Sequence, residues 1–182
     1  MAVDLDVITG LNGADNMGGY KSRLLWYPES DFSAAPLLPK VIAANEDYVT
    51  AAGAFVPKVA GTKPTVFNAT DATVKYSAPS QGELEGQSYA PTGEFYRAGS
   101  KVEYGAFARK YNNTPGYLVL EDMDGKQILV GQPGLLCNLK AEYDGGQKRA
   151  DRRGIKFTFS ADSLAPVVYL GTHIDIDALL AD

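Results

Sequence analysis

The chain contains one cysteine and one histidine in 182 residues, Cys137 and His173. A lone cysteine cannot form a disulfide within the chain, and zinc, haem or iron–sulfur sites need clusters of histidine or cysteine ligands. A Ser-His-Asp or Cys-His catalytic site would have to use this one histidine, and no G-x-S-x-G sequence is present. We therefore expect a partly exposed histidine, a buried structural cysteine, no metal site, no cofactor and no enzymatic activity.

Basic residues are also few. Lys and Arg number 17 against 22 Asp and Glu, which gives a net charge of −5 and a pI near 4.9. Non-specific binding to nucleic acid depends on cationic side chains that release counterions from phosphates, so a DNA clamp is not expected. The sequence has no run of 18 apolar residues, and it begins with acidic residues where a signal peptide carries basic ones. These patterns predict no membrane contact and assembly in the cytoplasm.

Glycine and proline, by contrast, are spread along the whole length, with 19 and 10 residues. Between them lie short segments rich in Val, Tyr, Phe, Thr and Leu, which are typical of strands. The predicted strands are residues 72–76, 117–120, 127–130, 135–142, 155–160 and 167–170. A chain of this length buries about 70% of the surface that its unfolded form exposes. We therefore expect a mainly β fold that forms one domain over residues 1–182, with residues 1–20 as an N-terminal arm.

Two strand pairs are predicted in the second half of the chain. Residues 116–131 contain two apolar runs on either side of the turn sequence DMDG, in which glycine supplies a positive φ. The segments 135–142 and 155–160 form the second pair, whose connection 143–154 is too long for a tight turn and predicts an arm. The polar residues 77–88 predict another protruding hairpin. Both 77–88 and 143–154 are therefore candidate loops for contact between subunits.

One helix is predicted, over residues 100–113. Ser100 followed by Glu103 forms a capping-box pattern, which satisfies free backbone N–H groups at the start of a helix. The helix is expected to end near Asn113, because Asn tolerates the left-handed conformation and a proline follows at position 115. Gly105 costs roughly 1 kcal/mol relative to Ala inside a helix. Its presence predicts either close packing at that position or a weaker helix.

Other patterns that could carry chemistry have simpler interpretations. The turn at 122–125 resembles the start of a calcium loop, but the later ligand positions lack oxygen-bearing side chains, so a hairpin turn is favoured. The glycines near the N-terminus are not followed directly by the Lys-Ser/Thr pair of a phosphate-binding loop. The carboxylate pairs Glu83 with Glu85 and Glu121 with Asp122 could act as acid and base, but acidic neighbours in turns are usually solvated.

A basic cluster lies within the predicted arm 143–154. Four cations and one anion of a net acidic chain gather there, and arginine side chains pair well with carboxylates at interfaces. A solvated loop is one interpretation, and contact of the cluster with an acidic strip of a neighbouring copy is the other. Eleven tyrosines are more than a small core needs, so some are expected at contacts. The candidate contact residues are Lys148, Arg149, Asp151, Arg152, Arg153, Glu83 and Glu85.

The order of the elements over residues 65–171 resembles that of bacteriophage tail tube proteins. The resemblance rests on the capped helix at 100–113, the hairpin in GYLVLEDMDGKQILVGQPG and a final strand pair ending in RRGIKFTFSADSLAPVVYLG. It implies an antiparallel β-sandwich or small barrel with one flanking α-helix and long loop arms. It also implies stacked hexameric rings whose inner sheets close into a barrel, within a virion tail that contains other tail proteins. DNA would pass through such a barrel without specific binding.

An acidic chain suits this role, because a channel lined with Asp and Glu would repel phosphates. Other roles stay open at this point. A tail-terminator or baseplate component would share the same fold. A carbohydrate-binding adhesive β-sandwich would use its tyrosines as stacking platforms, and an enzyme of unrecognised type would need a titratable residue in a cleft.

Overall fold

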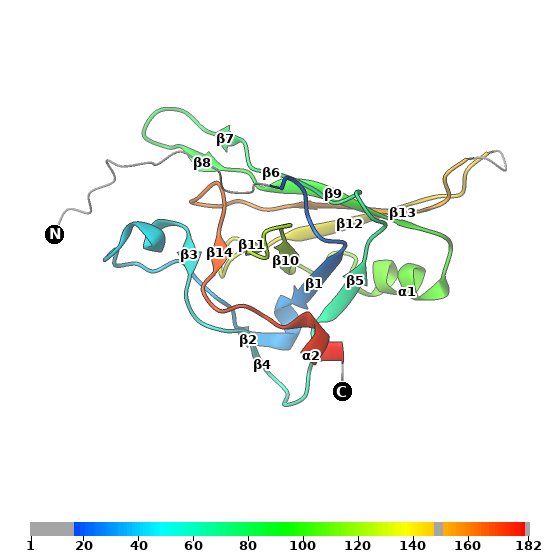
Figure 1. Cartoon of the computed structure of the whole chain (residues 1–182), viewed down its shortest axis with the longest axis horizontal. Helices are drawn as coiled ribbons and strands as arrows, with labels where there is room; N and C mark the ends of the chain where they lie inside the picture. Colours follow the sequence, from blue (N-terminus) through cyan, green and yellow to red (C-terminus); the bar gives the residue numbers. More distant parts are fainter. Residues whose placement is uncertain (1–16, 148–150, 181–182) are drawn as a thin grey trace.

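Two β-sheets packed face to face make up the body of the protein (Figure 1). The computed structural model describes residues 17–147 and 151–180. In spatial order, the strands of the larger sheet are β3 (Thr50–Ala51), β14 (Tyr169–Leu170), β11 (Gln127–Val130), β10 (Gly116–Glu121), β1 (Arg23–Pro28) and β5 (Thr65–Asn68). Those of the smaller sheet are β12 (Asn138–Asp144), β13 (Gly154–Ser160), β9 (Thr92–Ala98) and β6 (Lys75–Ser77). Neighbouring strands pair antiparallel except β14 and β3, which are parallel. The mainly β fold predicted from the sequence is confirmed.

The remaining described elements are short. The strand β2 (Phe32–Ala34) pairs with β4 (Val56–Pro57), and β7 (Ser80–Gln81) pairs with β8 (Ser88–Tyr89). The helical elements are α1 (Val102–Lys110), α2 (Ile176–Leu180) and the 3₁₀ turns η1 (Glu29–Asp31) and η2 (Asn45–Tyr48). Within residues 17–147 and 151–180, no helix is long and apolar enough to cross a membrane.

The main core lies between the two sheets. Side chains alternate along a strand, so Ile155, Phe157 and Phe159 of β13 are buried while Lys156 between them lies on the outer face. The rings of Phe95 and Phe157 stack with their centroids 4.9 Å apart. The larger sheet contributes the facing side chains Leu24, Trp26, Phe67, Leu118, Leu120, Ile128 and Val130.

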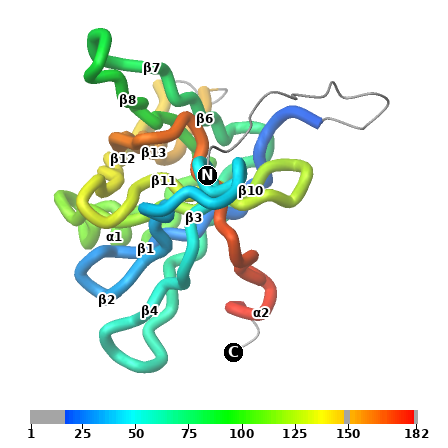
Figure 2. The backbone as a smooth tube through the Cα atoms, turned by 90° about the vertical axis from the view of Figure 1, so that its left-hand side faces the viewer, coloured from blue at the N-terminus to red at the C-terminus, as the bar shows by residue number. Residues whose placement is uncertain are grey.

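The larger sheet is buried on its other face as well. Leu25, Tyr27, Val119 and Leu129 form a second apolar cluster there. The segments around β2 and β4 and the C-terminal α2 lie on this side of the molecule (Figure 2). Tyr27 stacks on Phe55 in this layer, with a centroid distance of 3.7 Å. Burial of both faces explains why β1, β10 and β11 are continuous apolar runs in the sequence.

Both predicted strand pairs are present. The strands β10 and β11 form the predicted hairpin, and Gly125 in its turn has φ 85° and donates its N–H to the Asp122 carbonyl at 3.2 Å. The strands β12 and β13 pair over seven residues, from Asn138 opposite Ser160 to Asp144 opposite Gly154. The β7–β8 hairpin and the far end of the β12–β13 hairpin extend toward opposite ends of the molecule (Figure 1).

The helix α1 begins later than predicted. Lys101, and not Ser100, precedes its first turn, and no side chain caps it, so the predicted capping box is wrong. The cause is a contact with β13, which the local sequence does not contain. Gly99 has φ 98° and donates its N–H to the Arg153 carbonyl at 2.9 Å, so the chain stays in line with the sheet for longer.

The end of α1 and its packing agree better with the sequence. The helix stops at Lys110, and Asn113 adopts the predicted left-handed conformation with φ 62°. Phe107 packs the helix against the sandwich, with ring centroids 4.4 Å from Phe67 and 6.1 Å from Phe157. The helix therefore flanks the core, as expected.

Of the predicted strand 167–170, only residues 169 and 170 form a strand, β14. Two other predicted strands also begin later than expected. Residues 72–74 of the predicted strand 72–76 are not extended, because Ala72 lies in a turn with φ 56°. Residues 135–137 precede β12, because Leu135 and Gln132 exchange backbone hydrogen bonds at 2.8 and 2.9 Å around a tight turn. In both cases a turn takes residues that have good strand propensity.

Candidate functional site

The outer face of the smaller sheet carries a chain of ion pairs. Glu94 on β9 accepts from Lys156 of β13 at 2.6 Å and from Lys75 of β6 at 3.2 Å. These hydrogen bonds, the one from Lys156 first, hold the pKa of the Glu94 carboxyl below its ordinary value. The ion pairs therefore link three neighbouring strands across the surface of the sheet.

The same face is balanced in charge. Its alternating positions place Lys75, Lys140 and Lys156 beside Glu94, Glu142 and Asp144. The expectation of a surface lined with Asp and Glu does not hold for this face. Three lysines and three acidic residues share this face, and two of the lysines pair with Glu94, so the acidic excess of the chain lies elsewhere.

The strand β12 forms an open edge of this sheet. Ala161 donates its N–H to the Pro91 carbonyl, and the Arg153 carbonyl accepts from the Gly99 N–H. The odd-numbered residues at the two ends of β13 therefore bond to the β9 side. In an antiparallel sheet, the even-numbered residues of β13 then bond to β12.

The register of β12 and β13 therefore turns the N–H and C=O groups of Leu139, Ala141 and Tyr143 away from the sheet. Among the strands that the structure describes, none pairs with this side of β12. Beyond Leu139, the edge strand is exposed through to Asp144. The smaller sheet thus ends in backbone groups that can pair with another strand.

The two predicted glutamates lie at the tip of the β7–β8 hairpin. Glu83 and Glu85 are both exposed and flank Leu84, whose side chain is 86% exposed. The base of this hairpin is held by the Gln81 side chain, which donates to the Ser88 hydroxyl at 3.2 Å and to the Asp162 carboxylate at 2.8 Å. The predicted protruding hairpin is therefore present, and its tip is acidic and apolar at once.

Part of the predicted basic cluster is engaged within the chain. The Arg152 guanidinium lies 3.9 Å from the centre of the Tyr96 ring, and the Asp151 carboxylate accepts from the Gln147 N–H at 2.9 Å. The Arg153 carbonyl accepts the hydrogen bond from Gly99 noted above. Lys148 and Arg149 fall outside the described residues, as do residues 1–16 of the predicted N-terminal arm. The acidic and basic candidate loops lie at opposite ends of the molecule (Figure 1).

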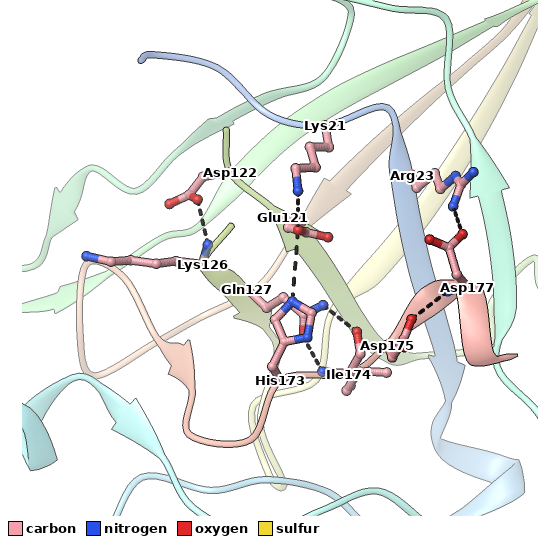
Figure 3. Close-up of polar contacts among 10 residues, drawn as sticks. All are labelled: Lys21, Arg23, Glu121, Asp122, Lys126, Gln127, His173, Ile174, Asp175 and Asp177. Atoms are coloured by element: carbon pink, nitrogen blue, oxygen red, sulfur yellow. Dashed lines mark hydrogen bonds and ion pairs between the residues drawn. The ribbon is translucent and has the colours of Figure 1, made fainter. Parts of the chain in front are cut away.

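A second polar cluster lies at the end of β10, where Glu121 is nearly buried (Figure 3). Its carboxylate accepts from the Lys21 ammonium at 2.5 Å, and His173 Nε2 lies 3.9 Å from the same oxygen. A cleft of about 390 Å³ adjoins these residues. Asp122 does not face Glu121 as the second member of an acid–base pair, because its carboxylate accepts from the Lys126 N–H in the hairpin turn at 2.7 Å.

The neighbouring contacts hold the C-terminal segment on the sheet. The Gln127 side chain donates to the Ile174 carbonyl and accepts from the Ile174 N–H, both at 2.8 Å. Arg23 of β1 pairs with Asp177 of α2, and the Asp175 carboxylate caps that short helix (Figure 3). We interpret this cluster as structural, because its charged groups join β1, β10 and β11 to residues 173–177.

The two residues with metal-binding or nucleophilic potential take the predicted environments. Cys137 is fully buried, and the His173 side chain is 58% exposed. Burial raises the pKa of the Cys137 thiol to about 12, against a smaller opposing effect of the Ser160 backbone. In residues 17–147 and 151–180, no three His, Cys, Asp or Glu side chains are grouped so that they could hold a metal ion.

Sequence reasoning missed two features. It named residues 77–88 as a contact loop, but it did not single out Leu84 at its tip. It also missed a groove between α1 and β12, lined by Phe107, Tyr111, Leu139 and other residues. An isolated leucine between two glutamates and two glycines was the available signal for the first, whereas the groove depends on the packing of distant segments.

Comparison with protein-family models, with curated proteins and with solved structures gives no match to this chain.

Proposed function

We propose that the protein is a structural subunit of a bacteriophage-type tail tube, which assembles with copies of itself into stacked, hexameric rings. The observation that carries this proposal is the smaller sheet. One of its faces is buried in the core, the other is polar, and its β12 edge is unpaired among the described strands. The ring and the tube are inferred from the order of the elements, which resembles that of bacteriophage tail tube proteins.

An open edge of this length favours association between copies. Unpaired strand edges promote contact with other chains, and closure of sheets into a ring removes them. The strands β12 and β6 form the two edges of the sheet and run in opposite directions. Pairing of β12 with β6 of a neighbouring copy would therefore be antiparallel, like the pairings inside the sheet.

The polar face would then line the channel. Lys75 and Lys156 both pair with Glu94, and the lysines of this face are matched in number by carboxylates, so these strands offer no surplus of lysines to hold phosphates. DNA would pass through the lumen without specific binding. The partners are other copies of the chain and other tail proteins, the site of assembly is the cytoplasm of the bacterial host, and the final location is the virion tail.

The first experiment measures the mass of the purified protein by light scattering over a concentration series, with negative-stain electron microscopy of the same samples. We expect rings or tubes of uniform width. Single rings that never stack would favour a tail-terminator or baseplate component over a tube subunit. A monomer of 19.5 kDa at every concentration would contradict self-assembly, and a carbohydrate screen would then test the adhesive alternative.

A proline in β12 tests the edge contact directly. The N–H of Tyr143 points away from β13, so Tyr143→Pro removes a group from the open edge and leaves the pairing of β12 with β13 complete. We expect the proline variant to fold but to form no rings or tubes, and Tyr143→Ala, which keeps the N–H, to assemble like the wild type. Normal tubes from Tyr143→Pro would show that β12 is not the contact.

A further inference from the structure

The loop at residues 82–86 presents one apolar side chain to solvent. We name it the Leu84 loop, because Leu84 at its centre is 86% exposed and is the most exposed large apolar residue of the described chain. Glu83 and Glu85 flank it, and neither forms an ion pair within the described residues. An exposed leucine between two free carboxylates has no stabilising role within its own subunit.

The backbone of the Leu84 loop has a defined shape. Gly86 donates its N–H to the Glu83 carbonyl at 3.0 Å, and Glu85 adopts a positive φ of 72°. Gly82 has φ 92°, and a Cβ at that position would lie 2.5 Å from the Gly86 carbonyl oxygen. A fixed turn that displays an apolar side chain loses little conformational entropy when that side chain binds elsewhere.

A groove of matching character lies between the last turn of α1 and β12. Its volume is about 210 Å³, roughly seven times the volume that one water molecule takes in the liquid, which is enough for a branched aliphatic side chain. Its lining residues include Phe107, Ala108, Tyr111, Leu139 and Phe157. We name this site the α1 groove.

The rim of the α1 groove is basic. Arg109 is exposed and lines the groove, and it forms no ion pair within residues 17–147 and 151–180. The Lys110 ammonium lies 4.9 Å from the centre of the Tyr111 ring beside it. The groove therefore combines aromatic and aliphatic lining residues with one lining cation, Arg109, and with Lys110 next to it in the helix, whereas the loop offers an apolar tip and two carboxylates.

We propose that Leu84 of one copy inserts into the α1 groove of a second copy, with Glu83 and Glu85 beside Arg109 and Lys110. The loop and α1 lie far apart in the molecule, so a subunit does not fill its own groove (Figures 1 and 2). The contact joins two different surfaces, and such head-to-tail contacts build rings or filaments. This inference rests on the proposed function and adds a second contact to the pairing of sheet edges.

The test uses the Tyr143→Pro chain, in which edge pairing is blocked, so that only the second contact is measured. We expect this chain to form oligomers that dissociate on dilution. Addition of Leu84→Asp should weaken the association about tenfold or more, because a charge replaces the apolar anchor. The matched control Val41→Asp changes another loop residue, 80% exposed, in the same way and should leave the association unchanged.

Mixing two defective chains gives the sharpest result. Both chains carry Tyr143→Pro. The one with Leu84→Asp keeps an intact groove, and the one with Arg109→Glu and Lys110→Glu keeps an intact loop. Each should be monomeric alone, and the mixture should reach twice the mass of one chain and no more. Circular dichroism and urea unfolding establish that every variant is folded.

Three results would overturn the inference. They are a Tyr143→Pro chain that is monomeric at all concentrations, oligomers that persist with Leu84→Asp, or a mixture that stays monomeric. Wild-type tubes that disappear with Tyr143→Pro would still support the proposed function in each of these cases. Conversely, oligomers that depend on Leu84, together with a wild type that forms no ring or tube, would support this contact and contradict the proposed tail tube function.

Discussion

Cys137 is the only cysteine of the chain, and its burial determines how it reacts. The thiol is fully enclosed in the main core, and its pKa is raised to about 12 from an ordinary value of 9.0. Because the thiolate is the reactive form, a thiol that is both enclosed and protonated reacts slowly with alkylating reagents. Modification of Cys137 therefore reports on opening of the core.

Stability should fall above pH 9, partly through Cys137. The unfolded thiol loses its proton near pH 9 while the folded one keeps it to about pH 12, so the unfolded state binds fewer protons between these values. The free energy of unfolding then decreases as pH rises, and by pH 10 this one group accounts for about 1 kcal/mol. Urea unfolding at pH 8, 9 and 10 measures the decrease. In Cys137→Ala the decrease should be smaller by that amount, and an equal decrease in both chains would contradict this origin.

The ion pair of Lys21 and Glu121 is a second test at this scale. Glu121 is 9% exposed, so loss of its cation leaves a carboxylate with little access to water. We expect Lys21→Met to lower the free energy of unfolding by about 1 kcal/mol, because Lys21 itself is half exposed and solvent screens the pair. The double variant Lys21→Met, Glu121→Leu should recover part of the loss in urea titrations. Additive losses in the double variant would show that the two residues do not interact.

Among the elements, α1 contains a glycine, Gly105, whose replacement should stabilise the helix. Gly105 does not have a positive φ, and a Cβ there would meet no atom within 4 Å, so neither close packing nor backbone strain explains the glycine. Gly105→Ala should therefore stabilise the subunit by about 1 kcal/mol. Thermal or urea unfolding of a chain that combines Tyr143→Pro with Leu84→Asp measures this effect without interference from assembly. A loss of stability would mean that the helix bends or packs differently at this residue.

The elements show which parts of the fold were predictable. The β10–β11 hairpin was predicted because its signal is local: two apolar runs and a turn ending in Gly125. The predicted start of α1 was wrong because the hydrogen bond between Gly99 and Arg153 joins residues 54 positions apart, and no local sequence pattern contains it. The cover over the second face of the larger sheet was also missed, since residues 32–57 have no clear period of apolar residues.

The candidate site was predictable to the same extent. Sequence composition identified both protruding loops, and the structure has β7–β8 and β12–β13 extending from the body. It did not identify the open edge of β12, because the side on which a strand lacks a neighbour depends on the order of strands in the sheet. It left Arg152 either in a solvated loop or at a contact with a neighbouring copy, and it did not identify the position of this side chain over Tyr96 of its own chain. Side chains at loop ends can be located from composition, but their partners cannot.

At the scale of the whole molecule, the features that face outward are separate from those that hold the subunit together. One apolar cluster lies between the two sheets, and the other lies on the second face of the larger sheet. The open edge, the Leu84 loop and the described part of the arm at 143–154 lie outside both clusters. Assembly and folding should therefore respond to different substitutions. This separation allows the arm to be removed without loss of the fold.

Replacement of residues 145–153 by Asn-Gly tests that separation. Asp144 and Gly154 are paired neighbours at the end of the β12–β13 ladder, and Asn-Gly favours the two-residue turn that joins such strands. We expect a chain with an unchanged far-ultraviolet spectrum, because none of the described residues in the removed stretch, 145–147 and 151–153, belongs to either apolar cluster. Loss of the Arg152 contact with Tyr96 should cost at most about 1 kcal/mol in urea unfolding. Under the proposed function the same chain should form no tubes in negative-stain images. Tubes of normal length would show that the arm is a solvated loop, and a chain that no longer unfolds cooperatively would show that the arm belongs to the fold.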